Sequence, residues 1–175
     1  LTGKDLDDSW RALFERDPAK ADIAIWNLIE CPDDSLAYLR KKLQPSPIPD
    51  PDRVQRLLAD IDNGNFQTRM RADAELEKLG ELILTQLDRA IKKADSLESR
   101  RRLESLAFRA RQASRPFATL TRIGEWRALE VVEKIGQPRA VEILRDLANG
   151  SPEAQLTIAA RAALMRAEAR SKTTR

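Results

Sequence analysis

The apolar positions of this chain repeat one spacing pattern three times. In each copy a small residue is followed by apolar residues four and seven positions later, then at once by Gly or Pro, and then by apolar residues four, seven and eleven positions further on. The copies are Ala24, Leu28, Cys31, Pro32, Leu36, Leu39 and Leu43; Ala72, Leu76, Leu79, Gly80, Leu84, Leu87 and Ile91; and Ala128, Val132, Ile135, Gly136, Ala140, Ile143 and Leu147. Steps of three and four place residues on one face of an α-helix, and Gly or Pro separates one helix from the next. Each copy therefore predicts a hairpin of two helices.

Further helices are predicted around the copies, near residues 6–15, 52–62 and 96–112, and a last helix carries Ala160, Leu164 and Ala167. Repeated helical hairpins stack into an α-solenoid. The predicted fold is therefore all-α, an α-solenoid of roughly nine to ten helices in a single domain over residues 1–175. Within it, 1–43 form the first hairpin region, 52–170 the remaining repeats and a cap, and 171–175 a frayed tail.

A proline-rich segment follows the first hairpin. Residues 44–51 contain four prolines, which predict a stiff, extended linker. Because Ile48 is apolar and the prolines limit the freedom of the backbone, we expect the linker to dock the first hairpin rigidly. A second break, from Pro116 to Thr121, predicts a loop.

The composition agrees with a helical domain and argues against several classes of function. Of 175 residues 42% are hydrophobic and 34% are charged, which is typical of helices with one face open to water. No apolar run approaches the roughly 20 residues of a membrane-spanning helix. The sequence has no histidine and no phosphate-binding loop, so we expect no enzyme activity, metal or cofactor. The single cysteine, Cys31, is expected to be a buried small apolar residue.

The stretch 66–80 resembles a HEAT-type repeat, with Phe66, Arg69, Ala72, Leu76, Leu79 and Gly80 where that family carries its usual residues. Over nearly the whole chain, an ordered series of blocks resembles the HEAT-like helical region that follows WD40 propellers in large planctomycete proteins. These blocks are residues 24–28, 39–43, 49–53, 99–104 and 127–136. The resemblance implies a scaffold or protein-interaction domain of a larger, WD40-containing protein, and it brings no catalytic residues with it.

Cationic side chains recur at the ninth position after each hairpin break, at Lys41, Arg89 and Arg145. At about 100° per residue this position lies away from the apolar stripe, so these side chains should be exposed. In stacked hairpins the second helices line the concave face, where partners usually bind. The three cations are either a basic ladder for an acidic partner or simple complements to the helix dipoles.

The helix predicted at 96–112 is rich in arginine, and Arg102 and Arg109 are seven residues apart on one face of it, with Arg101 beside them. From Arg89 to Arg127 the chain holds eleven basic residues against four acidic ones. Such a cluster suits phosphate or an acidic protein. The alternative is a solvated face paired with the more acidic remainder of the protein.

Three functional hypotheses follow. The first is a non-catalytic protein–protein interaction scaffold whose partner is a protein, with an acidic one favoured by the basic ladder. The second is binding of nucleic acid or another polyanion through the arginine-rich helix and the ladder. The third, an enzyme, has no catalytic motif to support it. The tryptophans, Trp10, Trp26 and Trp126, are expected to pack in the core or at its edge, and a cytoplasmic location is slightly favoured.

Overall fold

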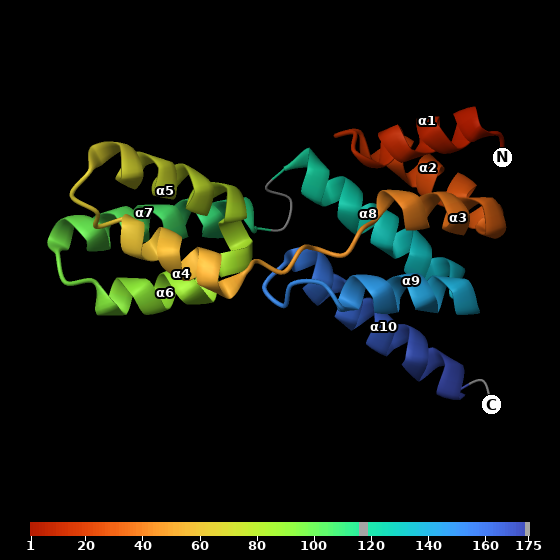
Figure 1. The fold of residues 1–175 in the computed structure, drawn as a ribbon. Coiled ribbons are helices and arrows are strands. Elements are labelled where there is room, and N and C mark those ends of the chain that lie inside the picture. The colour runs from red at the N-terminus through yellow and green to blue at the C-terminus, as the bar shows by residue number, and fades with distance from the viewer. Residues whose placement is uncertain (116–118, 174–175) are drawn as a thin grey trace. The chain divides into compact units, whose positions relative to one another are not determined.

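The computed structural model describes residues 1–115 and 119–173, and in this part of the chain every regular element is helical. There are ten α-helices and one 3-10 turn within the described residues, which agrees with the predicted all-α class. The chain divides into two compact units (Figure 1). Unit 1 consists of Leu1–Ser46 together with Pro116–Arg175, and unit 2 is Pro47–Arg115.

Unit 1 contains six helices, which are α1 (Gly3–Leu13), α2 (Pro18–Glu30), α3 (Pro32–Lys42), α8 (Leu120–Ile135), α9 (Pro138–Ala148) and α10 (Gln155–Thr173). Helix α8 lies against α2 and α10, while α9 packs between α3 and α10. Helix α1 covers α2 and α8. One core joins these helices, and its fully buried side chains include Leu13, Leu28, Leu39, Val131 and Leu147.

The ends of these helices follow from local sequence. Thr2 and Asp5 form a capping box at the start of α1. Asp17 caps α2 and is followed by a proline in the first turn. Helix α8 ends at Gly136, whose left-handed φ of 62° favours glycine. Helix α8 begins at Leu120 after the N-cap Thr119, so the loop predicted as far as Thr121 ends earlier.

Unit 2 contains α4 (Pro51–Asp60), α5 (Phe66–Leu79), the 3-10 turn η1 (Gly80–Ile83), α6 (Leu84–Lys93) and α7 (Leu97–Ala113). Helix α4 packs on α5 and α6, and α7 packs on α5, η1 and α6. The core of this unit is separate from that of unit 1 and includes Val54, Ile61, Leu76, Ile83 and Leu87. The hairpin break at Gly80, which has a φ of 50°, is therefore followed by a short 3-10 turn before the second helix starts.

The helices of all three predicted hairpins are present. In two of these pairs the helices pack on each other, α2 with α3 and α8 with α9, and these two hairpins also meet through α2 with α8 and α3 with α9. In the second copy, α5 and α6 are linked by η1 and each packs on α4 and α7 of unit 2 instead. Proximity along the sequence therefore does not set which copies pack together.

Smaller differences from the sequence predictions concern individual residues. The linker is extended and Ile48 is 69% exposed, so Ile48 does not anchor the linker as its apolar side chain suggested. The linker is held instead through Ser46, whose carbonyl oxygen accepts a 2.9 Å hydrogen bond from the backbone N–H of Ser151. Cys31 is half-buried rather than buried. Ser171, where a frayed tail is predicted to begin, lies inside α10, and residues 174–175 lie outside the described part.

Candidate functional site

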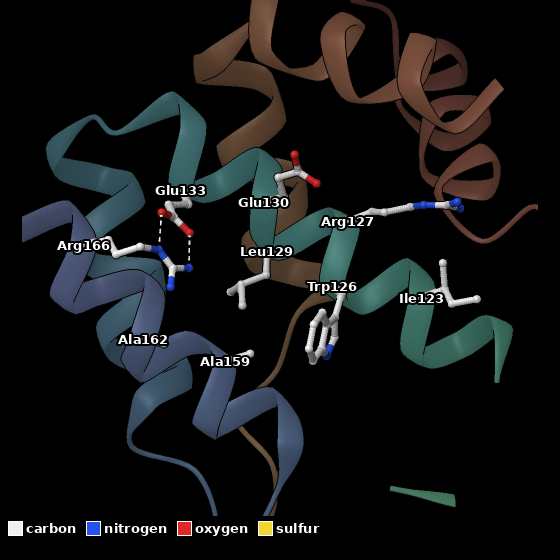
Figure 2. A pocket seen from close by; sticks show the side chains of 9 residues that line it. All are labelled: Ile123, Trp126, Arg127, Leu129, Glu130, Glu133, Ala159, Ala162 and Arg166. Atoms are coloured by element: carbon white, nitrogen blue, oxygen red, sulfur yellow. Dashed lines mark hydrogen bonds and ion pairs between the residues drawn. The ribbon is translucent and has the colours of Figure 1, made fainter. Parts of the chain in front are cut away.

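An apolar groove of unit 1 lies between α8 and α10 and has a volume of about 550 Å³. Helix α8 contributes one stripe of side chains to it, including Ile123, Trp126 and Glu133, which are three and seven residues apart along the helix. Helix α10 contributes Ala159 and Ala162 from the facing wall. We call this the α8/α10 groove (Figure 2).

The groove is open because small and large side chains face each other across it. Figure 2 shows Trp126 and Leu129 on the side of α8 that faces Ala159 and Ala162 of α10. An alanine side chain ends at its β-carbon, so two of them one turn apart leave space in front of the indole ring. The result is an apolar surface that can receive a side chain from another molecule.

An ion pair closes one end of the groove. Nε of Arg166 donates to Oε1 of Glu133 at 2.8 Å, and its Nη2 donates to Oε2 at 2.6 Å. Arg170 adds a 3.3 Å contact to the same carboxylate. The hydrogen bonds from Arg166 outweigh burial and hold the pKa of Glu133 below its ordinary value. This two-pronged contact fixes α10 to α8 beside the apolar floor.

The other charged side chains at the rim are also held by the protein itself. Nη1 of Arg127 donates to the carbonyl oxygens of Leu13 and Glu15 at 2.7 and 2.8 Å, so it caps the C-terminal end of α1 and points away from α10. Glu130 pairs with Lys134 at 2.9 Å. These charges already have partners within the protein, so the surface left open in the groove is mainly apolar.

Exposed apolar side chains continue the groove outward. On α10, Ile158 is 46% exposed and Met165 is 71% exposed, and both lie on the stripe next to Ala162. On α2, Trp26 is 53% exposed and stacks under the ammonium group of Lys134 at 5.2 Å. Trp26 thus departs from the prediction of core packing, whereas Trp10 and Trp126 are half-buried. Large exposed apolar side chains around a groove are typical of a protein-binding surface.

The basic residues predicted as a binding surface are divided between the two units. Lys41 and Arg145 belong to unit 1, and both are exposed. Arg145 pairs with Glu168 at 3.7 Å. Arg89, Arg101, Arg102 and Arg109 belong to unit 2.

Two of the arginines on α7 are engaged within unit 2. Arg102 pairs with Glu98 at 2.5 Å, one turn earlier on the same helix. Arg109 contacts Glu77 at 2.8 Å and Asp73 at 3.6 Å, both on α5. Arg101 is exposed beside Arg102. Arg102 is thus paired within its own helix, and Arg109 with carboxylates that come earlier in the chain.

Sequence reasoning missed the α8/α10 groove, although one signal was present. Ala159, Ala162 and Ala163 give α10 a face of small residues, and Trp126 was treated only as a packing residue. Within the described residues, no three His, Cys, Asp or Glu side chains gather closely enough to hold a metal ion. No helix in the described ranges is long and apolar enough to cross a membrane.

Comparison of this chain with protein-family models, with curated proteins and with solved structures finds no match.

Proposed function

We propose that this chain is a non-catalytic protein-interaction scaffold and that the α8/α10 groove is a docking site for an apolar segment of a partner protein. The observation that carries the proposal is an apolar floor between α8 and α10, bordered by charges that already have partners and extended by exposed Ile158 and Met165. The partner segment would insert an aliphatic or aromatic side chain against Trp126 and Leu129. Aromatic anchors in water-excluding pockets supply much of the energy of protein interfaces.

The arrangement of helices in unit 1 supports a HEAT-like relationship. Two hairpins lie side by side, with α2 next to α8 and α3 next to α9, and α10 adds a further helix. We propose that unit 1 is a short α-solenoid of HEAT-like hairpins and that it serves within a larger, WD40-containing protein. The α8/α10 groove involves α8, the first helix of its hairpin, and so does not lie on the row of second helices from which the basic ladder was predicted. The proposal therefore rests on the apolar floor of the groove itself.

Binding of nucleic acid or another polyanion through α7 is the alternative. The ion pairs of Arg102 and Arg109 weigh against it, because phosphate would have to displace Glu98, Glu77 and Asp73. Lys41 and Arg101 are exposed, so polyanion binding through them is still a hypothesis that experiment can test.

The groove can be tested by selecting peptides from a random phage-displayed library on the intact chain. We expect the enriched peptides to carry large apolar residues, to change the fluorescence of Trp126 on binding, and to lose binding to Ala162→Arg. Ala37→Arg is the matched control, because Ala37 is an exposed alanine on α3 of the same unit. Circular dichroism of each variant checks that it is folded.

Two results would overturn the proposal. The first is a selection that enriches no peptide. The second is a set of peptides that bind wild type and Ala162→Arg equally well, because an arginine at position 162 must fill the space in front of Trp126 and Leu129.

A further inference from the structure

Unit 2 contains a second groove, between α4 and α6, with a volume of about 400 Å³. Its two walls have the same construction. Helix α4 contributes Pro51, Val54, Gln55 and Leu58, and α6 contributes Gln86, Arg89, Ala90 and Lys93, so each wall has positions i, i+3, i+4 and i+7 of one helix. Seven residues of helix span roughly 10 Å, so the groove extends along about two helical turns.

The two walls differ in chemistry. Val54 and Leu58 on α4, with Ala90 on α6, make an apolar strip. Arg89 and Lys93 on α6 lie along this strip, and none of the lining residues is Asp or Glu. The groove therefore combines an apolar floor with positive charge on one side.

These two cations differ from those of unit 2 that are held in ion pairs. Arg53, Arg102, Arg109 and Arg111 each pair with a carboxylate, on Glu75, Glu98, Glu77 and Asp88 respectively. Within the described residues, neither Arg89 nor Lys93 has a carboxylate partner within 4.0 Å. Their charges are thus available to a ligand.

We propose that the α4/α6 groove binds an acidic amphipathic segment of a partner protein. Apolar side chains of the segment would lie along Leu58 and Ala90, and its carboxylates would pair with Arg89 and Lys93. Charge complementarity of this kind selects the partner and speeds association. This site is formed by other residues and another unit than the α8/α10 groove, so it stands or fails independently of the function proposed for that groove.

The test uses the intact chain and a labelled synthetic peptide in which leucines recur at helical spacing and the remaining positions are mostly glutamate. Binding is followed by fluorescence anisotropy at low and physiological salt. Two peptides serve as comparisons, one with lysine in place of glutamate and one with the same composition in scrambled order. Polyglutamate and a DNA duplex probe for general attraction of polyanions.

The protein variants separate this groove from the general charge of unit 2. We expect Arg89→Glu/Lys93→Glu to weaken binding of the acidic peptide roughly tenfold to a hundredfold, since two attractive pairs become repulsive. Arg100→Glu/Arg101→Glu is the matched control, with the same change in net charge on exposed positions of α7, and should change binding less than the groove variant.

The expected pattern is binding of the acidic amphipathic peptide, weaker binding of the scrambled peptide and none of the lysine peptide. Equal binding of the scrambled peptide, polyglutamate or duplex would overturn the proposal, because any polyanion would then suffice. Equal loss of binding in both double variants, or no binding of the acidic peptide at either salt concentration, would overturn it as well.

Discussion

Replacing Gly124 by alanine should destabilise unit 1, although helix propensity alone predicts the opposite. Gly124 is buried in the interior of α8, where Gly→Ala normally gains about 1 kcal/mol. A β-carbon at position 124 would, however, lie under 3.0 Å from three ring atoms of Phe14, namely Cγ, Cδ1 and Cε1. Because the clash includes Cγ as well as Cδ1 and Cε1, rotating the ring about its own axis does not relieve it, and the whole ring must move.

The movement of Phe14 is restricted because its ring packs against Trp10, with centroids 4.8 Å apart. Overpacking of this kind costs about 1–3 kcal/mol, and subtracting the gain of about 1 kcal/mol in helix propensity leaves a net loss of up to about 2 kcal/mol. In a Phe14→Ala background the obstacle is gone, and Gly124→Ala should then be neutral or stabilising. The sign of the effect therefore depends on residue 14.

Urea unfolding followed by tryptophan fluorescence measures this effect cleanly. The three tryptophans, Trp10, Trp26 and Trp126, all belong to unit 1, so the signal does not report unit 2. Gly64→Ala, at a site in unit 2 with nothing within 4 Å, should leave the tryptophan transition unchanged. Stabilisation of the wild type by Gly124→Ala, or the same change in unfolding free energy in both backgrounds, would refute the proposed contact between α1 and α8.

Three further outcomes are expected. Tyr38 donates a 2.5 Å hydrogen bond to Asp7, and burial together with this contact raises the pKa of Tyr38 to about 12 from 10.0. Since Tyr38 is the only tyrosine, the ultraviolet absorbance of tyrosinate should give a titration midpoint near pH 12 in the folded chain and near pH 10.0 in urea. The free energy of unfolding should fall as pH rises between these two values. A midpoint near pH 10.0 in the folded chain would contradict the prediction. Glu133→Gln should lower the stability of unit 1 at neutral pH by about 1–3 kcal/mol. Because the pKa of Glu133 is lowered in the folded state, the stabilisation is complete above pH 4.5 and is lost as pH falls through the lower folded pKa. The unfolding free energies of the variant and the wild type should therefore become equal in acid. A difference that stays constant with pH would argue against the ion pair with Arg166. Finally, fluorescence anisotropy with labelled duplex and single-stranded DNA should show no tight binding at physiological salt; tight binding abolished by Arg102→Glu/Arg109→Glu would instead favour the polyanion alternative.

The local structure of this chain could be predicted because its signals are short-range. Apolar steps of three and four residues predict the helices, and Asp17, Gly80 and Gly136 mark where helices begin or end. Two insertion helices, α4 and α7, also lie close to where their apolar stripes predict them.

The packing of the hairpins could not be predicted in the same way. The stripes of α2, α5 and α8 consist of similar aliphatic residues, so nothing in their spacing says that α2 meets α8 while α5 meets α4. The partners of Arg109 were equally hidden, because Asp73 and Glu77 come near it only when α5 packs on α7. The α8/α10 groove depends on the absence of side-chain volume at Ala159 and Ala162, which a search for charged or catalytic residues does not detect.

The division of unit 1 into two segments has a consequence for how the protein is made. During synthesis α1, α2 and α3 leave the ribosome first. Their core residues, such as Leu28 and Leu39, cannot pack against α8 and α9 until unit 2 has also been translated. Unit 2 is continuous in sequence and can complete its own core in the meantime. Once unit 2 has folded, the two segments of unit 1 are linked by a folded domain and no longer by a long flexible loop. Less conformational entropy is then lost when these segments come together. Weakening the core of unit 2 should therefore slow the assembly of unit 1 even though the two cores are separate.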